Sequence, residues 1–381
     1  GVSIATLDTY TFKLNSSYTI SSGDTAFYAK LSNINGIGAD LDSTDDSKTV
    51  FINIFEPVLG KVVVVEEATG TWCGWCPRGT VAMDYLERDY NGYAAGIAVH
   101  NNDPMADSAY DANMGPRISG YPNALVDRGS GMNPVAIFTP VRESLLKNPM
   151  AILTNGASYD ASTGLLNVSI TADFAGAANN NWKLACTLTE DSITGSGSGY
   201  NQSNSYSGGG SGSLVGPDGV DWASLPSSVP ASQMVYNHVA RAIAPNFNGN
   251  ASSFPPMVSN GDSYTVGFEF VIDPSWDMDK MHIVGMLIEP NGEVNNGSTS
   301  TIEEAEAHGY VPAWNISIGE NLIGPDVNVK IYPNPSASQN TKVYLNGKHD
   351  NVTSKVYTLS GKLVLSRGFG ALENEEVTIN T

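Results

Sequence analysis

The sequence predicts a multidomain protein that combines one α/β domain with all-β domains. Apolar and polar residues alternate with a period of two through residues 1–58 and through most of the chain after residue 150, as half-buried strands require. Between Lys61 and about Pro149, strand-like and helix-like segments alternate instead, which is typical of βα units. The 39 glycines and a charged fraction of only 15% favour β-rich architecture with many turns. At 381 residues the chain has room for roughly two to four domains.

The N-terminal segment, residues 1–58, is predicted to be β-rich, with about three or four short strands such as 26–31 and 50–55. It is small for a complete sandwich, so we interpret it as a partial immunoglobulin-like segment. Its acidic loop could hold a calcium ion, but the loop lacks the Gly and Glu spacing of an EF-hand. A solvated turn is therefore the preferred interpretation for Asp40, Asp42, Asp45 and Asp46.

Residues 59–150 are predicted to form the α/β domain. The run of four valines at 62–65 suits a strand buried on both faces. Asn133 and Pro134 supply an N-cap and a first-turn proline for a last helix that ends near Leu146. Between these points the pattern predicts a helix over 78–90, a strand over 94–100, a helix over 105–114 and a strand over 123–128.

Residues 151–318 return to period-two alternation and predict an antiparallel β-sandwich domain, with clear strands at 166–174, 264–272 and 282–288. The Gly/Ser/Asn-rich stretch 194–217 predicts a long mobile loop. A final set of strands, residues 322–381, forms a separate small β-sandwich domain.

The bulk properties exclude several classes of function. A formal net charge of −20 repels nucleic acid and anionic lipid, so neither is expected as a main partner. Three cysteines are too few for a disulfide-stapled scaffold, and no apolar run approaches the ~20 residues of a membrane span. No signal peptide is present, but Gly1 is not a natural initiator. We therefore interpret the chain as a processed or recombinant fragment, so the missing signal does not argue for the cytoplasm.

The motif Cys73-Gly74-Trp75-Cys76 lies between the valine strand and the first helix. A helix N-terminus favours a thiolate on the first sulfur, and a second sulfur at this spacing can form or resolve a disulfide. Redox chemistry that needs no cofactor is therefore the leading hypothesis. A zinc site would need two more soft ligands, and neither the solitary Cys186 nor the scattered histidines supply them. A structural disulfide is the other alternative.

This region resembles the thioredoxin superfamily, through Trp72 to Cys76 after a valine strand and through the later Gly120-Tyr121-Pro122 segment. The resemblance covers roughly residues 59–150 and implies a thioredoxin-like α/β domain flanked by β-sandwich domains. It further implies that Cys73 is the exposed, attacking sulfur and Cys76 the buried, resolving one. Pro122 would follow a cis peptide bond and face the two sulfurs, beside a groove in which a partner chain lies as an extra strand.

Supporting roles follow for the neighbouring side chains. The resemblance implies a buried carboxylate that helps to move the resolving proton, at Glu67 or, with a one-residue shift, Glu66. Strand alternation allows only one of the two to point inward, and both could instead face solvent. Arg78 could lower the pKa of Cys73 or could be a solvated first-turn arginine. Trp72 could shield the thiolate or be a core aromatic, and Trp75 stands where the superfamily tunes redox poise.

Three further residues or segments are interpreted as ordinary structure. His100, at the end of the second strand, could approach the active-site rim, but a surface or capping role is preferred. Cys186 shares one strand face with Trp182, Leu184 and Leu188, which predicts a buried, inert thiol. The helix at Asn133 follows Arg128 so closely that the last edge strand of the superfamily is predicted to be lost or very short.

The C-terminal region resembles the sorting domain of type IX secretion cargo. Its opening Val-x-Val-x-Ile-Tyr-Pro-Asn-Pro, residues 327–335, and the later Leu-Ser-Gly-Lys-Leu-Val turn, residues 359–364, carry this resemblance. It implies export across the outer membrane, type IX secretion machinery as a partner, and a protein that is secreted or at most peripheral to that membrane. Such domains normally continue through two more strands, so the module is expected to be incomplete here. With the upstream region, the chain resembles the secreted outer-membrane-protein-28-like branch of the thioredoxin superfamily.

Two functions compete on these grounds. The first is a secreted or surface thiol–disulfide oxidoreductase that acts on protein thiols and disulfides through Cys73 and Cys76. The second is a surface binding or structural protein that keeps Cys73–Cys76 as an inert disulfide and has its activity in residues 151–318. The first is preferred, because a structural disulfide needs neither a cis-proline loop nor a helix dipole beneath one sulfur.

Overall fold

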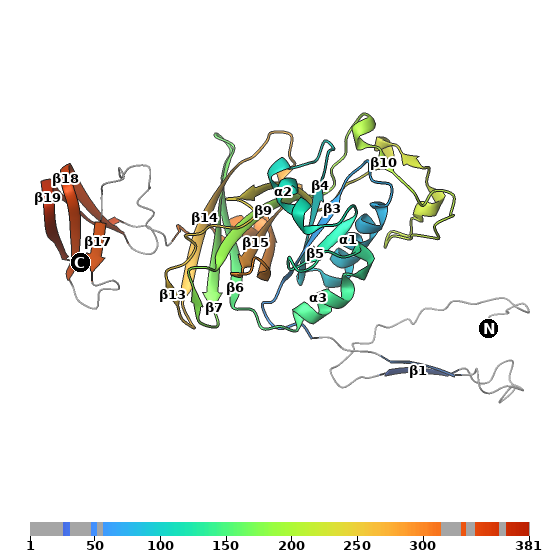
Figure 1. Cartoon of the computed structure of the whole chain (residues 1–381), viewed down its shortest axis with the longest axis horizontal. Coiled ribbons are helices and arrows are strands. Elements are labelled where there is room, and N and C mark those ends of the chain that lie inside the picture. The colour runs from blue at the N-terminus through green and yellow to red at the C-terminus, as the bar shows by residue number, and fades with distance from the viewer. Residues whose placement is uncertain are drawn as a thin grey trace, which may run out of the picture. The chain divides into compact units, whose positions relative to one another are not determined.

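In the computed structural model of the chain, the structure describes residues 26–30, 47–51, 56–313, 329–332, 340–357 and 363–380. The chain divides into two compact units, Gly1–Pro57 and Val58–Thr381 (Figure 1). In the first unit, β1 (Ala26–Lys30) pairs antiparallel with β2 (Ser47–Phe51). β1 matches the predicted strand 26–31, whereas β2 overlaps only the start of the predicted strand 50–55, whose residues 52–55 lie outside the described residues. The acidic loop at residues 40–46 lies outside the described residues.

The second unit contains the remaining described elements. Its helices are α1 (Pro77–Tyr90), α2 (Ser108–Met114), α3 (Phe138–Leu145) and α4 (Ile302–His308). Its strands up to residue 301 are β3 (Val63–Thr69), β4 (Ala94–His100), β5 (Asn123–Val126), β6 (Ala151–Asp160), β7 (Leu165–Phe174), β8 (Ala178–Asn179), β9 (Lys183–Glu190), β10 (Gln202–Ser203), β11 (Ser228–Val229), β12 (Val239–Ala244), β13 (Met257–Val258), β14 (Ser263–Val271), β15 (Met281–Ile288) and β16 (Val294–Thr301).

A seven-stranded mixed sheet forms the centre of this unit, in the order β16-β15-β9-β12-β4-β3-β5. As predicted from the βα pattern, β3 and β4 are parallel, whereas β5 lies antiparallel to β3 at the edge. At the other edge, the Gly297 N–H donates to the Val62 carbonyl and the Val294 N–H donates to the Asp127 carbonyl, 2.8 Å in each case. The two ends of the sheet therefore meet, and the sheet curls around a core.

This sheet contains strands from both sides of the predicted boundary at residue 150. β3, β4 and β5 precede that boundary, while β9, β12, β15 and β16 follow it. One apolar core contains Val64 and Ile97 from the first group together with Ala185 and Met286 from the second. The two segments thus share a hydrogen-bonded sheet and a core, which period-two alternation within each segment does not reveal.

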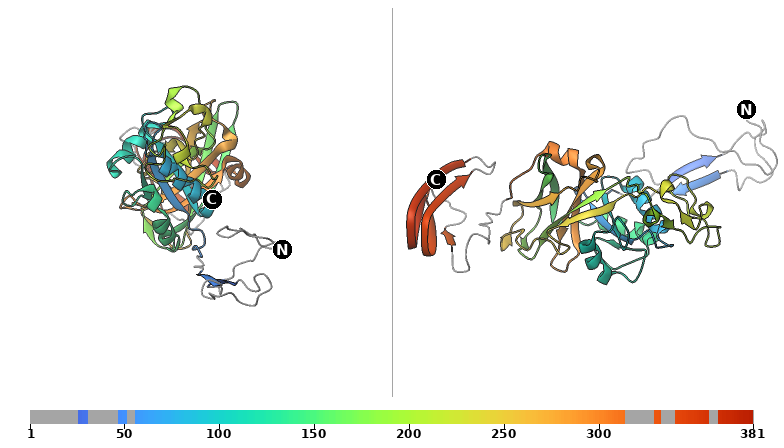
Figure 2. Two further views of the ribbon diagram at one scale, coloured as in Figure 1. Left: turned by 90° about the vertical axis from the view of Figure 1, so that its right-hand side faces the viewer. Right: turned by 90° about the horizontal axis from the view of Figure 1, so that it is seen from above.

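A second sheet, in the order β14-β7-β6, packs face to face on β9 and β15 (Figures 1 and 2). Leu184, Cys186 and Leu188 alternate along β9 and meet Ile170 and Phe268 of the second sheet in a buried core. The three strands predicted in this region correspond to β7, β14 and β15. The chain is therefore β-rich, as expected.

The valine strand is buried along its whole length, because helices and loops cover both of its faces. α1 begins directly after Cys76, with Pro77 in its first turn, where a missing N–H costs nothing. Later, Asn133 Oδ1 accepts from the Val135 N–H, and Pro134 opens a short 3-10 helix that leads into α3. The predicted cap is thus confirmed, and α3 ends within one residue of the predicted end.

The Gly/Ser/Asn-rich stretch 194–217 is a long and mostly irregular segment, with only a 3-10 helix at Ser198–Tyr200 and the strand β10, and its Tyr206 side chain is buried. β10 pairs with β11, and Tyr206, Trp222, Met234 and Tyr236 form a buried cluster with Val81 of α1. The small polar residues therefore serve close backbone packing, while a few aromatic residues hold the segment in place.

Toward the C-terminus, the described strands β17 (Val329–Tyr332), β18 (Asn340–Tyr357) and β19 (Leu363–Asn380) form an antiparallel sheet in that order. This sheet lies in the region predicted to form the final set of strands. Within the described residues, no helix is both long and apolar enough to cross a membrane.

Candidate functional site

Cys73 and Cys76 form a disulfide at the start of α1. The loop that carries them is tightly turned, because the Cys73 N–H donates to the Gly70 carbonyl and the Cys76 N–H donates to the Cys73 carbonyl. The Cys76 carbonyl then accepts from the Gly79 N–H at 2.8 Å, which joins the loop to the first turn of the helix. The disulfide therefore stands at the positive end of the helix dipole, as the sequence predicted.

Both cysteines are buried, with exposed fractions of 3% for Cys73 and 1% for Cys76. Residues 202–206, here called the cap, run across the disulfide loop. The Ser203 N–H donates to the Thr71 carbonyl and the Ser205 N–H donates to the Gly74 carbonyl, each at 2.8 Å. Gln202 Nε2 adds a bond to the Cys73 carbonyl at 3.0 Å. The expectation of an exposed Cys73 is therefore wrong. The local motif could not reveal this burial, because the cap consists of residues far along the chain.

Gly74 makes this close approach possible. A Cβ atom at position 74 would overlap the Oγ atom of Ser205, so even an alanine there would require the Ser205 side chain to turn away from the disulfide loop. The glycine between the cysteines thus has a packing reason that the sequence alone did not supply.

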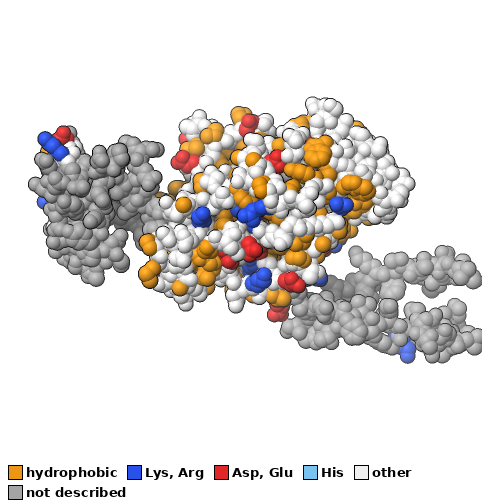
Figure 3. All heavy atoms as spheres, in the orientation of Figure 1, with side chains coloured by type: hydrophobic (Ala, Val, Ile, Leu, Met, Phe, Trp, Pro, Cys, Tyr) orange, Lys and Arg blue, Asp and Glu red, His pale blue; other side chains and the backbone are white. Residues whose placement is uncertain are grey.

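Two tryptophans of this loop reach the surface. Trp72 precedes Cys73 and is 48% exposed, and Trp75 lies between the two cysteines and is 43% exposed. Trp72 stands edge-on to Tyr121 with 5.3 Å between ring centroids, and its Nε1–H donates to the Asn101 carbonyl. Trp75 stands edge-on to Tyr206 of the cap at 5.4 Å. We call Trp72, Trp75 and Tyr121 the aromatic face. Figure 3 shows apolar side chains at the surface over the region where β4 and β10 are labelled in Figure 1.

The Tyr121–Pro122 peptide bond is cis, as the resemblance implied. Pro122 itself is buried, and Tyr121 contacts Trp72, the residue that precedes Cys73. The later proline segment therefore lies beside the disulfide loop.

Glu66 and Glu67 are both buried, on opposite faces of β3, so the expectation that only one points inward is wrong. Glu66 accepts from Arg128 at 2.9–3.1 Å and from the Tyr110 hydroxyl at 2.6 Å. Glu67 lies under the first turn of α1, where a Cβ atom on Gly79 would overlap its Oε1 atom. The two side chains do point to opposite faces of β3, but both faces of this strand are covered, so both carboxyls are buried.

Burial raises the pKa of Glu67 from 4.5 to about 8, and the nearby Asp84 carboxylate adds to this effect. Among the described residues, Glu67 Oε1 has no hydrogen-bond partner. A carboxyl in this state can hold or release a proton near neutral pH.

Arg78 is partly buried, with its guanidinium carbon 5.9 Å from the centroid of the Trp75 ring. It is therefore not a freely solvated first-turn arginine. Its position over Trp75 orients that ring next to the cysteine loop.

His100 is buried rather than at the surface, which corrects the preferred interpretation. Its Nδ1 atom lies 2.6 Å from Asp103 Oδ2, and the same carboxylate oxygen accepts from the Thr71 N–H at 2.9 Å. His100 thus helps to fix the loop that leads into Cys73.

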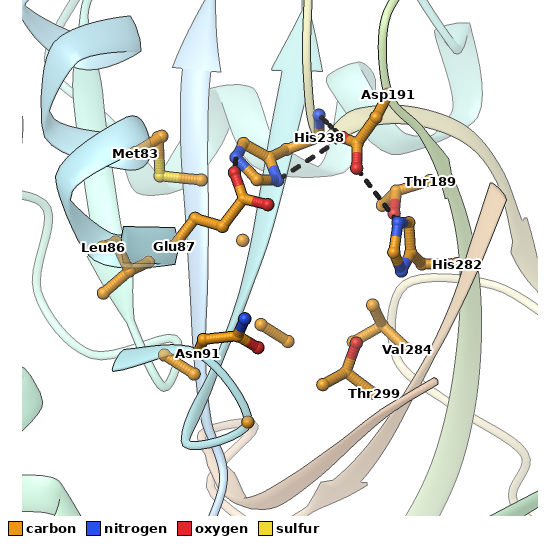
Figure 4. Close-up of a pocket in the computed structure, with 14 residues that line it drawn as sticks. Met83, Leu86, Glu87, Asn91, Thr189, Asp191, His238, His282, Val284 and Thr299 are labelled. Atoms are coloured by element: carbon orange, nitrogen blue, oxygen red, sulfur yellow. Dashed lines mark hydrogen bonds and ion pairs between the residues drawn. The ribbon is translucent and has the colours of Figure 1, made fainter. Parts of the chain in front are cut away.

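A cavity of about 90 Å³ lies between the C-terminal half of α1 and the strands β9, β15 and β16 (Figure 4). Its polar wall is formed by Glu87, Asp191, His238 and His282, while Met83 and Val284 belong to its apolar wall. Contact with Asp191 raises the pKa of His282, and hydrogen bonds from the histidines lower the pKa of Asp191 despite its burial.

The sequence reasoning missed this cluster, since its four side chains come from four separate segments. The one available signal was the presence of two histidines beside strand-like segments, which is too weak to bring them together. Within the part of the chain that the structure describes, no group of three or more His, Cys, Asp or Glu side chains could hold a metal ion. Cys186 is fully buried, as predicted, and burial raises the pKa of its thiol.

Comparison with solved structures gives only distant similarity. A crystal structure of a protein from Agrobacterium tumefaciens shares 14% identity over 64% of this chain and 95% of its own, with a TM-score of 0.35. Red sea bream transglutaminase shares 9% identity over 81% of this chain and 40% of its own, with a TM-score of 0.21. TM-scores this low support no conclusion about the fold, and no curated protein matches the chain significantly.

Comparison with protein families is more informative. The secretion system C-terminal sorting domain matches residues 330–381, which contain β18 and β19, as the Tyr-Pro-Asn-Pro opening predicted. The model of outer membrane protein Omp28 matches residues 107–306, more than half of the chain, from the start of α2 almost to the end of α4. The chain therefore belongs to the outer membrane protein Omp28 family and is a secreted or cell-surface protein associated with the outer membrane.

Proposed function

We propose that this protein is an exported binding protein, in which the Cys73–Cys76 disulfide is structural and the aromatic face contacts the ligand. The observation that carries this proposal is a contrast along one short loop. Both cysteines are buried beneath the cap, while the tryptophans on either side of Cys73 are nearly half exposed.

Thiol–disulfide exchange requires a thiolate to reach a sulfur atom directly. The cap prevents such an approach through three hydrogen bonds to the disulfide loop, from Gln202, Ser203 and Ser205. A Cys-x-x-Cys bridge closes too short a loop to stabilise the whole fold by chain entropy. Its effect is therefore local, and it holds the loop in the shape that projects Trp72 and Trp75 outward.

Exposed tryptophans and tyrosines are the side chains most often found at the energetic centre of an interface. Trp72 and Trp75 are held in fixed orientations by the contacts with Tyr121 and Tyr206, so little side-chain entropy would be lost on binding. Because the cap belongs to residues 151–318, the proposal also assigns part of the binding activity to that segment.

The test compares binding by the Trp72→Ala/Trp75→Ala variant with binding by the parent, on an array of immobilised peptides and bacterial surface glycans. Tyr93→Ala is the matched control, because Tyr93 is also 48% exposed but lies after α1, away from the aromatic face. We expect the double variant to lose the parent's signals and the control to keep them. Equal signals from all three proteins would contradict the proposal.

A second candidate function is thiol–disulfide exchange by a thioredoxin-like domain, and two observations favour it. The Tyr121–Pro122 segment lies next to Trp72, and burial raises the pKa of Glu67 to about 8 beneath the helix that Cys76 opens. In this reaction, an external dithiol would first reduce the Cys73–Cys76 bond and be oxidised to its disulfide, and the Cys73 thiolate would then attack a partner disulfide and release one partner thiolate. The Cys76 sulfur would then attack Cys73 and release the second, while Glu67 takes the Cys76 proton.

This second function requires displacement of the cap, so it predicts a measurable activity. Reduction of insulin disulfides by dithiothreitol would be faster with the parent protein than with Cys73→Ser. If the parent accelerates reduction and the variant does not, the oxidoreductase replaces the binding protein as the function. Equal, uncatalysed rates retain the structural disulfide.

A further inference from the structure

The seven-stranded sheet has a narrow seam between β4 and β12. Only one residue pair, Val239 opposite Ala98, joins these two strands in the ladder, whereas β3 and β4 pair along their whole length. The Ala98 N–H also donates to the His238 carbonyl at 2.6 Å. The half of the sheet covered by α1 is therefore joined to β12, β9 and β15 by few backbone hydrogen bonds at this point.

Four alternating acidic and imidazole side chains cross the same seam (Figure 4). Glu87 Oε2 on α1 lies 3.5 Å from His238 Nε2, and His238 Nδ1 lies 3.6 Å from Asp191 Oδ1. The other Asp191 oxygen lies 3.0 Å from His282 Nε2 on β15. Glu87 is on α1, which covers the β3–β4 half of the sheet. The other three side chains are on or next to the strands of the second half, β9, β12 and β15.

His238 is held in a conformation that an ordinary residue avoids. Its φ angle is 58°, and its N–H donates to Asp191 Oδ1 at 2.6 Å. A non-glycine residue stays in this region only where its surroundings require it, and such residues gather at functional positions. Here the backbone conformation directs the imidazole ring between the two carboxylates.

We propose that Glu87, His238, Asp191 and His282 form a pH-dependent clasp across this seam, which holds while His282 carries a proton and loosens as His282 loses it. A protonated His282 attracts Asp191 beside it and Glu87 across the seam, whereas a neutral one leaves these two carboxylates to repel each other. Loosening the clasp would widen the cavity between α1 and β15.

The surroundings of the clasp are acidic on every side that packs against it. Asp84 of α1 lies near Glu87, Asp191 and Asp218, and Glu304 of α4 adds negative charge near His282. Glu190 is already paired with Arg241 at 2.6 Å, so that arginine does not neutralise the clasp. Loss of the His282 proton would therefore leave several carboxylates close together with few cations.

The direction of the effect follows from His282. Its contact with Asp191 raises its pKa above the ordinary value of 6.5. The folded state then holds this proton more tightly than the unfolded state, so the stabilisation is complete below pH 6.5 and is lost as the pH rises through the raised pKa. Asp191, with its pKa lowered, stays ionised over this range.

Amide hydrogen exchange tests the proposal in the full chain. We expect the protection of β4 and β12 amides, corrected for intrinsic exchange rates, to fall between about pH 5.5 and about pH 8. β6 and β7, which lie outside the seam, serve as the internal reference. In His282→Gln, which keeps a hydrogen-bond donor but does not titrate, the excess of this fall over the fall in β6 and β7 should shrink, because the contribution of Glu67 is the same in both proteins.

Two further variants make the result decisive. Glu87→Gln removes the charge on the α1 side of the clasp at a side chain that is 55% exposed, and should also weaken the pH dependence. His308→Gln is the matched control, because His308 Nδ1 lies 3.0 Å from the Asn155 carbonyl oxygen of β6, away from the seam, and this variant should behave like the parent. The proposal is overturned if β6 and β7 lose protection as much as β4 and β12, or if His282→Gln and Glu87→Gln keep the parent's pH dependence.

Discussion

At the scale of single residues, adjacent glutamates on β3 have opposite electrostatic environments. Glu66 is paired with Arg128 and receives a hydrogen bond from Tyr110, so it is buried as an ion with its partners. Glu67 is buried without a cationic partner, and its pKa rises to about 8. The two side chains differ only in the face of the strand that carries them, yet one is part of an ion pair and the other favours its neutral form.

The first prediction concerns Glu67 and pH. Between pH 4.5 and about 8, the folded state binds one proton at Glu67 that the unfolded state does not, so the free energy of unfolding falls as the pH rises through this range. In Glu67→Gln this part of the fall should be absent, a difference on the order of a few kcal/mol at pH above 8. Urea unfolding of both proteins across this range measures it. Parallel pH profiles would contradict the raised pKa.

The second prediction concerns Arg128. Replacing it with Met leaves Glu66 buried without its cation, which should lower the free energy of unfolding by about 3–5 kcal/mol. Arg128 also lies over the Phe247 ring at 3.6 Å, so part of the loss reflects packing. The double variant Glu66→Gln/Arg128→Met should regain much of the loss in urea unfolding at neutral pH. A double variant no more stable than Arg128→Met alone would show that the ion pair is not the cause.

At the scale of elements, the cap decides what the disulfide loop can do. The loop and α1 have the local arrangement that thiol chemistry needs, with a sulfur at a helix N-terminus. The cap then covers the cysteines by hydrogen bonds to the loop backbone at Thr71, Cys73 and Gly74. Residues from elsewhere in the chain thus separate the two cysteines from the surface.

The third prediction tests the cap through Gly74. A Cβ atom at this position would overlap Ser205 Oγ, so Gly74→Ala should force the Ser205 side chain to turn away and loosen the cap over the disulfide. Reduction of the Cys73–Cys76 bond by a phosphine under native conditions should then be faster than in the parent. Gly115→Ala is the control, because a Cβ atom there meets nothing within 4 Å. Equal reduction rates in all three proteins would show that the cap does not protect the bond.

At the scale of the whole molecule, one sheet joins the segment before residue 150, where strands and helices alternate, to the segment after it, where apolar and polar residues alternate with a period of two. β4 lies between β3 and β12, so removal of residues after 150 would expose one edge of β4 and half of the core around Val64 and Ile97. The domain boundaries drawn from the sequence remain predictions. The shared core indicates whether a fragment cut at residue 150 can fold by itself.

The fourth prediction follows from this shared core. A fragment of residues 58–313 should unfold in one cooperative transition, because it contains both sheets and the core between them. A fragment of residues 59–150 should not, because it lacks the β9, β12 and β15 side chains that cover β4. Far-UV circular dichroism during heating distinguishes the two. A cooperative transition in the shorter fragment would restore the boundary at residue 150.

The sequence predicted the local elements well, for reasons that lie in neighbouring residues. The four valines, the proline after Cys76 and the Asn133-Pro134 pair each act over a few positions, and each corresponds to the expected strand, helix or cap. The cis bond before Pro122 and the inert thiol of Cys186 were also expected. In contrast, the burial of Cys73 beneath residues 202–206 was not expected, because it depends on contacts between residues more than a hundred positions apart.

By itself, the sequence determined the β-rich character, the disulfide-forming pair at a helix start and the sorting tail, since composition, spacing and short motifs carry these properties. Only the tertiary structure decided whether those sulfurs reach solvent and which carboxylates and imidazoles meet across the sheet. The physical reason is that burial and long-range charge contacts are set by which segments pack together, and such packing leaves no periodic trace in any one of them.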